Sequence, residues 1–132
     1  MSRTAAGKSS ETEFQMLKVL WSLKSATVAQ VRERYNAQNG TALAYTTVMT
    51  LLGRLVAKGA VKVDREREPY LYTATTRRQT ALRERLESFV KSVFDGNADE
   101  LALQLVESEA LSDEAVDRLR AAIARRRKES RA

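Results

Sequence analysis

The chain has 132 residues, 43% of them hydrophobic and 30% charged, with a single proline, a composition typical of one small helix-rich globular protein. It has no cysteine and no histidine, which excludes disulfides, metal sites built from those residues and catalytic pairs that need them. We therefore expect that the protein binds no metal ion and no cofactor and that it is not an enzyme. The net charge of +6 favours a polyanionic partner. The basic excess lies in residues 1–74, with 11 basic against 6 acidic side chains, whereas residues 75–132 have 12 against 11.

Two helices are predicted in the first 40 residues. Ser10 and Glu13 have the spacing of a capping box, which opens a helix expected to end near residues 22–24. Thr27 and Gln30 repeat that spacing and open a second, shorter helix. Residues 36–41, NAQNGT, are rich in turn formers and predict a loop. The apolar residues expected to face the core are Phe14, Leu17, Leu20, Trp21, Val28, Val31 and Tyr35.

The segment Ala44–Lys58 predicts a third helix with one buried face. Its apolar residues have the spacing i, i+3, i+4, i+7, i+8, and they are Val48, Leu51, Leu52, Leu55 and Val56. Its other side chains are short, hydroxylic or basic, and none is acidic. Such a surface can approach a nucleic-acid groove without repelling the phosphates, although an ordinary amphipathic surface helix is the alternative. Gly59 stands where a glycine commonly ends a helix.

A β-hairpin is predicted directly after this helix. Residues 60–65 and 70–74 alternate apolar and polar side chains, and the charged residues 66–69 lie between them as a turn. Three short helices followed by a two-stranded hairpin is the order of a winged helix-turn-helix domain. In that arrangement the third helix is the recognition helix and the hairpin is the wing.

The candidate DNA contacts lie at the exposed positions of the third helix and on the wing. Threonine can bind a base edge or a phosphate, both threonine and methionine can touch a thymine methyl, and the basic side chains can reach phosphates or the minor groove. The candidates are Tyr45, Thr46, Thr47, Met49, Thr50, Arg54 and Lys58 on the helix, and Lys62, Arg65 and Arg67 on the wing. The alternative is a solvated surface, which three acidic wing residues favour: Asp64, Glu66 and Glu68.

Residues 75–132 predict three further amphipathic helices with wide apolar faces. Their apolar residues are Leu82, Leu86, Phe89, Val90, Val93, Phe94, Leu101, Leu105, Val106, Val116, Leu119 and Ile123. Fewer than 60 residues offer little core of their own, so pairing with a second copy would bury these faces across a two-fold axis. The alternative is that they pack back on the first domain. We expect a DNA-binding domain at 1–74 and a helical dimerisation domain at 75–132.

Four segments together resemble a known family. They are LKVLW (17–21), VAQVRERY (28–35), AYTTVMTLLGRLVAKG (44–59) and PYLYTA (69–74), with LALQLVESEALSDE (101–114) similar to a dimerisation region. The chain resembles the penicillinase-repressor family of bacterial regulators, of the BlaI/MecI/CopY type. The resemblance implies a homodimeric transcriptional repressor whose winged helices bind an operator in double-stranded DNA with dyad symmetry. A winged helix that binds protein or RNA is the alternative.

The resemblance also bears on the inducing signal. In antibiotic-responsive members a membrane sensor-protease pathway leads to cleavage between the dimerisation helices, at an Asn-Phe bond in the staphylococcal proteins. Aligned through the LVE motif, this chain has Gln104 and Leu105 at that bond, a departure from the staphylococcal pattern. The Cys-x-Cys pair of copper-responsive members is missing. Without a signal peptide core or a run of roughly 20 apolar residues, the chain is expected to be cytoplasmic and not inserted in a membrane.

Overall fold

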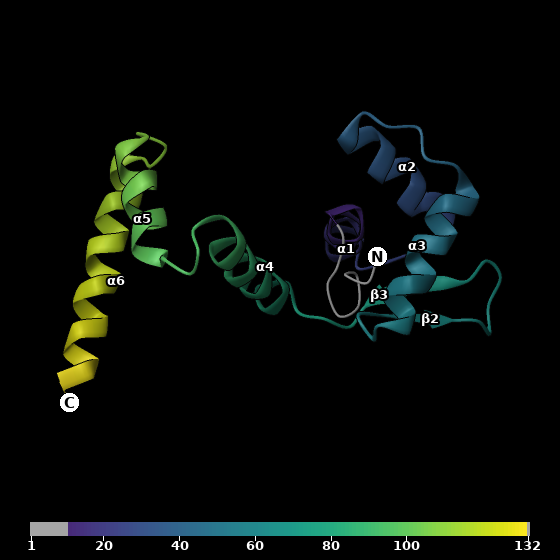
Figure 1. Ribbon diagram of the computed structural model, residues 1–132. Helices are drawn as coiled ribbons and strands as arrows, with labels where there is room; N and C mark the ends of the chain where they lie inside the picture. Colours follow the sequence, from purple (N-terminus) through teal and green to yellow (C-terminus); the bar gives the residue numbers. More distant parts are fainter. Residues whose placement is uncertain (1–10, 132) are drawn as a thin grey trace. The chain divides into compact units, whose positions relative to one another are not determined.

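The computed structural model describes residues 11–131, and these form six helices and three short strands (Figure 1). The helices are α1 (Glu11–Leu23), α2 (Val28–Asn39), α3 (Tyr45–Ala57), α4 (Arg78–Val93), α5 (Ala98–Glu107) and α6 (Asp113–Arg131), and the strands are β1 (Ser25–Ala26), β2 (Val61–Asp64) and β3 (Leu71–Ala74). The predicted fold class, mainly helical with a winged helix-turn-helix followed by further helices, is confirmed. The chain divides after Arg83 into two compact units. The domain boundary expected after residue 74 stays a prediction.

The start of α2 is the capping box predicted from the sequence. Thr27 Oγ1 accepts a hydrogen bond from Gln30 N at 3.2 Å, and Gln30 Oε1 accepts one from Thr27 N at 2.9 Å. The loop predicted at residues 36–41 is wrong in its first part, because α2 continues to Asn39. The side chain of Asn39 donates to Tyr35 O at 2.9 Å, and Gly40 then ends the helix with a φ of 62°.

The sheet has a strand that the sequence did not reveal. Its order is β1-β3-β2, with both neighbours antiparallel to β3, whereas only the hairpin of β2 and β3 was predicted. β1 is only two residues long, which is too short for an alternation of apolar and polar side chains to be recognised. Its pairing depends on a residue far along the chain: Ser25 lies opposite Thr73, and their hydroxyls are 3.0 Å apart.

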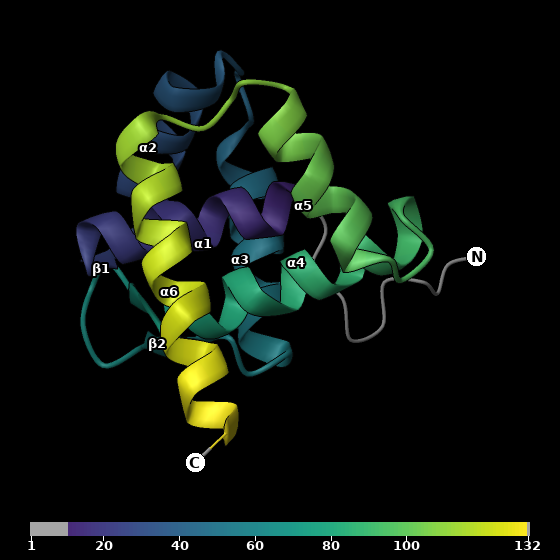
Figure 2. The same cartoon turned by 90° about the vertical axis from the view of Figure 1, so that its left-hand side faces the viewer.

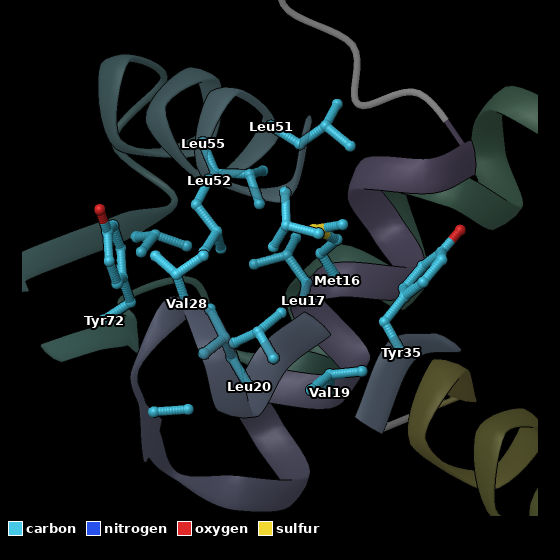
Figure 3. Packing of buried hydrophobic residues seen from close by; sticks show 14 residues of the cluster. Met16, Leu17, Val19, Leu20, Val28, Tyr35, Leu51, Leu52, Leu55 and Tyr72 are labelled. Carbon is cyan, nitrogen blue, oxygen red and sulfur yellow. The ribbon is translucent and has the colours of Figure 1, made fainter. Parts of the chain in front are cut away.

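The hydrophobic core of the first unit lies between α1, α2, α3 and the sheet (Figure 3). Met16, Leu20 and Leu52 are completely buried there. The predicted stripe of α3 is confirmed, since four of its five residues are buried and Val56 is partly buried against them. Gly59 follows the helix with a φ of 81°, a left-handed conformation that favours glycine.

Trp21 lies at the edge of this core and is only partly buried. Its indole Nε1 donates to Thr76 O at 2.9 Å, which ties α1 to the segment after β3. Phe14 meets the indole edge-on, with ring centroids 6.0 Å apart. The predicted capping residue of α1, Ser10, lies outside the described residues.

The second unit consists of the rest of α4 with α5 and α6, which short connections join and which Figure 2 draws in green to yellow. Gly96 lies in the first connection with a φ of 85°, and Asn97 Oδ1 accepts from Glu100 N at 3.0 Å to cap α5. Ser112 Oγ caps α6 in the same way by accepting from Ala115 N at 3.1 Å.

Candidate nucleic-acid interface

The outward face of α3 is free of acidic side chains and open to solvent. All six predicted contacts within this helix are exposed: Tyr45, Thr46, Thr47, Met49, Thr50 and Arg54. Tyr45 and Met49 expose 47% and 45% of their surface, which is unusual for large apolar groups at the start of a helix that buries its opposite face. Within the first unit these side chains point away from the core, where a groove of nucleic acid could reach them.

The wing brings basic and aromatic side chains together next to this face. Lys62, Arg65 and Arg67 are all exposed, and Arg65 Cζ lies 5.9 Å from the ring centroid of Tyr70. Burial raises the pKa of the Tyr72 phenol, and the nearby positive charge of Arg65 opposes that shift. The phenols of Tyr45 and Tyr70 act in the same direction as burial and raise this pKa further.

One acidic wing residue has a local structural role. Asp64 Oδ1 accepts a hydrogen bond from Glu66 N at 3.0 Å, the geometry of an Asx turn at the tip of the hairpin. This carboxylate therefore shapes the wing, and its presence between the basic residues is explained without a protein partner.

Lys58 is placed differently from the other predicted contacts. Its Nζ lies 2.6 Å from Glu13 Oε1, and the side chains of Lys58 and Glu13 are 26% and 4% exposed. The pair joins the end of α3 to the first turns of α1, so Lys58 anchors α3 to α1. The sequence pattern missed this because the two residues lie 45 positions apart.

Two side chains on α2 hold the turn before α3, and the sequence pattern did not reveal them. Asn36 and Arg32, both on α2, bind the backbone of Leu43, the residue two positions before α3 begins. Asn36 is the first residue of the NAQNGT segment, which was interpreted only as a loop. The asparagines in that segment could have indicated these hydrogen bonds, since asparagine amides often bind nearby backbone groups.

The predicted dimerisation residues of the second unit are mostly exposed in the single chain. Seven of the twelve expose large apolar surfaces: Leu86, Phe89, Val93, Leu105, Val106, Leu119 and Ile123. The partly buried ones are Leu82, Val90, Phe94, Leu101 and Val116. Leu103, which was not predicted, is 60% exposed. Neither α5 nor α6 has a buried residue, so these helices lack a core of their own.

The bond between Gln104 and Leu105 lies inside α5. Gln104 O accepts a hydrogen bond from Ser108 N at 2.9 Å, and both residues are exposed. Among residues 11–131, no group of acidic side chains is arranged to hold a metal ion. None of the helices in that range combines the length and apolarity of a membrane span.

The comparisons with known proteins agree with this architecture. The chain is a winged helix-turn-helix protein, and RosR of H. salinarum, in the structure of its hsRosR-S4 complex, shares the fold with a TM-score of 0.53 at 21% identity, over 82% of this chain and 95% of that one. The family model described as penicillinase repressor matches residues 9–125, so the chain belongs to the penicillinase repressor family.

Two curated relatives are similar over nearly their whole length. The penicillinase repressor of Bacillus licheniformis is 24% identical over 110 residues, which cover 83% of this chain and 84% of that protein. The methicillin resistance regulatory protein MecI of Staphylococcus aureus strain N315 is 24% identical over 111 residues, which cover 84% and 89%.

Proposed function

We propose that the chain is a DNA-binding transcriptional repressor that occupies an operator and blocks transcription. The observation that supports this most directly is the outward face of α3, which is exposed, hydroxylic and basic, and free of carboxylates, within a member of the penicillinase repressor family. Thr46, Thr47 and Thr50 would read base edges, and Arg54 and the wing residues Lys62, Arg65 and Arg67 would bind phosphates or the minor groove. Lys58 would contribute mainly by holding α3 in place.

The repressor would act as a homodimer on an operator with dyad symmetry. The exposed apolar side chains of α4, α5 and α6 support this, because a second copy would cover them with an equal set. Two linked winged helices bind two half-sites with an effective-concentration advantage that a monomer lacks. Weakening the dimer would therefore release the DNA.

Proteolysis of α5 is the inducing step that we propose, delivered by a membrane sensor-protease pathway. A protease needs an extended backbone, and α5 has only 10 residues and no buried side chain, so it can unwind locally. A cut at Gln104-Leu105 would separate α6 from α4. The test is the intact mass of the chain in cells before and after exposure to a β-lactam; an unchanged mass would contradict this step and leave the repressor proposal standing.

The DNA-binding proposal is tested by footprinting the purified protein on genomic DNA in the presence of excess random DNA. We expect protection of a dyad-symmetric site near a promoter. The double variant Thr46→Ala/Thr47→Ala should lose that protection and keep its fold, because both side chains are exposed and make no contact with the core. Thr80→Ala changes another exposed threonine, on α4; it is the matched control and should bind like the wild type. Binding without any preferred site would favour a winged helix that contacts protein or RNA.

A further inference from the structure

The five residues from Gly40 to Ala44, the recognition turn, connect α2 to α3. The side-chain amide of Asn36 is at the centre of this turn. Its Oδ1 accepts hydrogen bonds from Leu43 N at 2.9 Å and from Thr41 Oγ1 at 2.8 Å, and its Nδ2 donates to Leu43 O at 3.2 Å. Its backbone carbonyl accepts from Thr41 N at 3.2 Å.

The two bonds to Leu43 fix that residue in a way that one bond could not. Asn36 bonds both the N–H and the C=O of Leu43, as a neighbouring β-strand would. The backbone at Leu43 therefore cannot move away from α2 without breaking one of these hydrogen bonds. Arg32 Nε donates to the same carbonyl oxygen at 2.9 Å. The side chain of Leu43 is also packed against the core. Leu43 is therefore anchored on both its polar and its apolar side.

The start of α3 depends on this anchor because the helix has no cap of its own. Ala44 is the N-cap residue, and it has no side chain that could bind the free N–H groups of the first turn. The exposed residues at the start of α3 begin two positions after Leu43. A shift of Leu43 would therefore move Tyr45, Thr46 and Thr47 together.

We infer that Asn36 is a positioning residue that determines DNA sequence discrimination without touching the DNA. This inference rests on the proposed repressor function. Base readout requires side chains held within about half an ångström of the productive geometry, whereas phosphate contacts by long basic side chains tolerate displacement. Loss of the Asn36 amide should consequently weaken binding to the preferred sequence and spare binding to random DNA.

The experiment uses the full chain and two duplexes of equal length. One is selected from a random-sequence pool by the wild-type protein, and the other is a scrambled version of it. Asn36→Ala should lower the ratio of the two affinities about tenfold, the equivalent of losing one base-pair contact, with the affinity for the scrambled duplex unchanged. Asn36→Asp retains the acceptor for Leu43 N and Thr41 Oγ1 and should recover part of the ratio.

The matched control is Asn39→Ala. Asn39 lies on the same helix and its amide also donates to a backbone carbonyl, but that carbonyl, Tyr35 O, belongs to α2 and not to the recognition turn. Asn39→Ala should keep the wild-type ratio even if its melting temperature falls as much as that of Asn36→Ala. All variants are compared well below their own melting temperatures, so that only folded protein is measured.

Each outcome decides the inference. A folded Asn36→Ala protein with the wild-type ratio would overturn it, and so would an equal loss of ratio in Asn39→Ala. If Asn36→Ala does not fold, Asn36→Asp and Thr41→Ala, which each remove one bond of the network, decide in its place: an unchanged ratio in both overturns the inference. If the wild-type protein selects no sequence, the repressor proposal fails first, and the two failures are thus distinguishable.

Discussion

At the residue scale, Gly53 lies at the centre of the outward face of α3 without a structural need for glycine. A Cβ added there meets no atom within 4 Å. We expect Gly53→Ala to raise the free energy of unfolding by about 1 kcal/mol, because glycine inside a helix loses more backbone entropy than alanine. Urea unfolding measures the change. The reverse substitution at an exposed site of α2, Ala37→Gly, should lower the free energy of unfolding by a similar amount. If Gly53→Ala also lowered the free energy of unfolding, the added methyl group would have to clash with a neighbouring atom.

The ion pair between Glu13 and Lys58 gives a second prediction at this scale. Lys58→Met removes the ammonium group that faces the nearly buried carboxylate of Glu13. We expect the free energy of unfolding to fall by about 2 kcal/mol, which is less than for a fully buried pair because Lys58 is partly exposed. The salt dependence of DNA binding should change little. Arg54→Met is the matched variant: it should leave stability nearly unchanged and reduce the salt slope by about one. If Lys58→Met lowered the slope and not the stability, Lys58 would be a phosphate contact after all.

At the scale of elements, local sequence patterns predicted the helices correctly. The missed strand β1 and the misplaced end of α2 are explained by contacts between different segments of the chain. Val48, Leu51, Leu52 and Leu55 are buried as their spacing indicates, because helical periodicity is encoded within one segment. β1 escaped detection because two residues have no period, and Ser25 joins the sheet only through Thr73. The end of α2 was misplaced for a related reason.

The end of α2 shows how side-chain hydrogen bonds change the meaning of a sequence. Asparagine favours turns when its amide binds the backbone outside a helix, and residues 36–41 were interpreted accordingly. In the structure Asn36 remains helical and its amide extends forward to Leu43, so the same residue continues one helix and positions the next. The exposed face of α3 could be predicted from the sequence, but the hydrogen bonds that hold the turn before it could not.

At the scale of the whole molecule, the sequence indicates that the helices after Arg83 have apolar faces, but periodicity cannot identify what covers them. The same stripe would suit a second copy, the first unit or another protein. In the structure α5 and α6 bury no residue in the single chain, so their apolar faces are left uncovered. A hydrophobic surface of this extent is unusual on a protein that acts alone.

A single charge placed in this surface tests whether a second copy covers it. Ile123 is 50% exposed on α6, and Ile123→Asp would put one carboxylate from each copy into the proposed apolar subunit contact. We expect sedimentation to show monomers at micromolar concentration, and operator affinity to fall at least a hundredfold, because the second half-site then binds independently. Ala121→Asp adds the same charge about 200° around the helix and should leave the dimer intact. A dimeric Ile123→Asp protein with wild-type affinity would mean that this face of α6 lies outside the subunit contact.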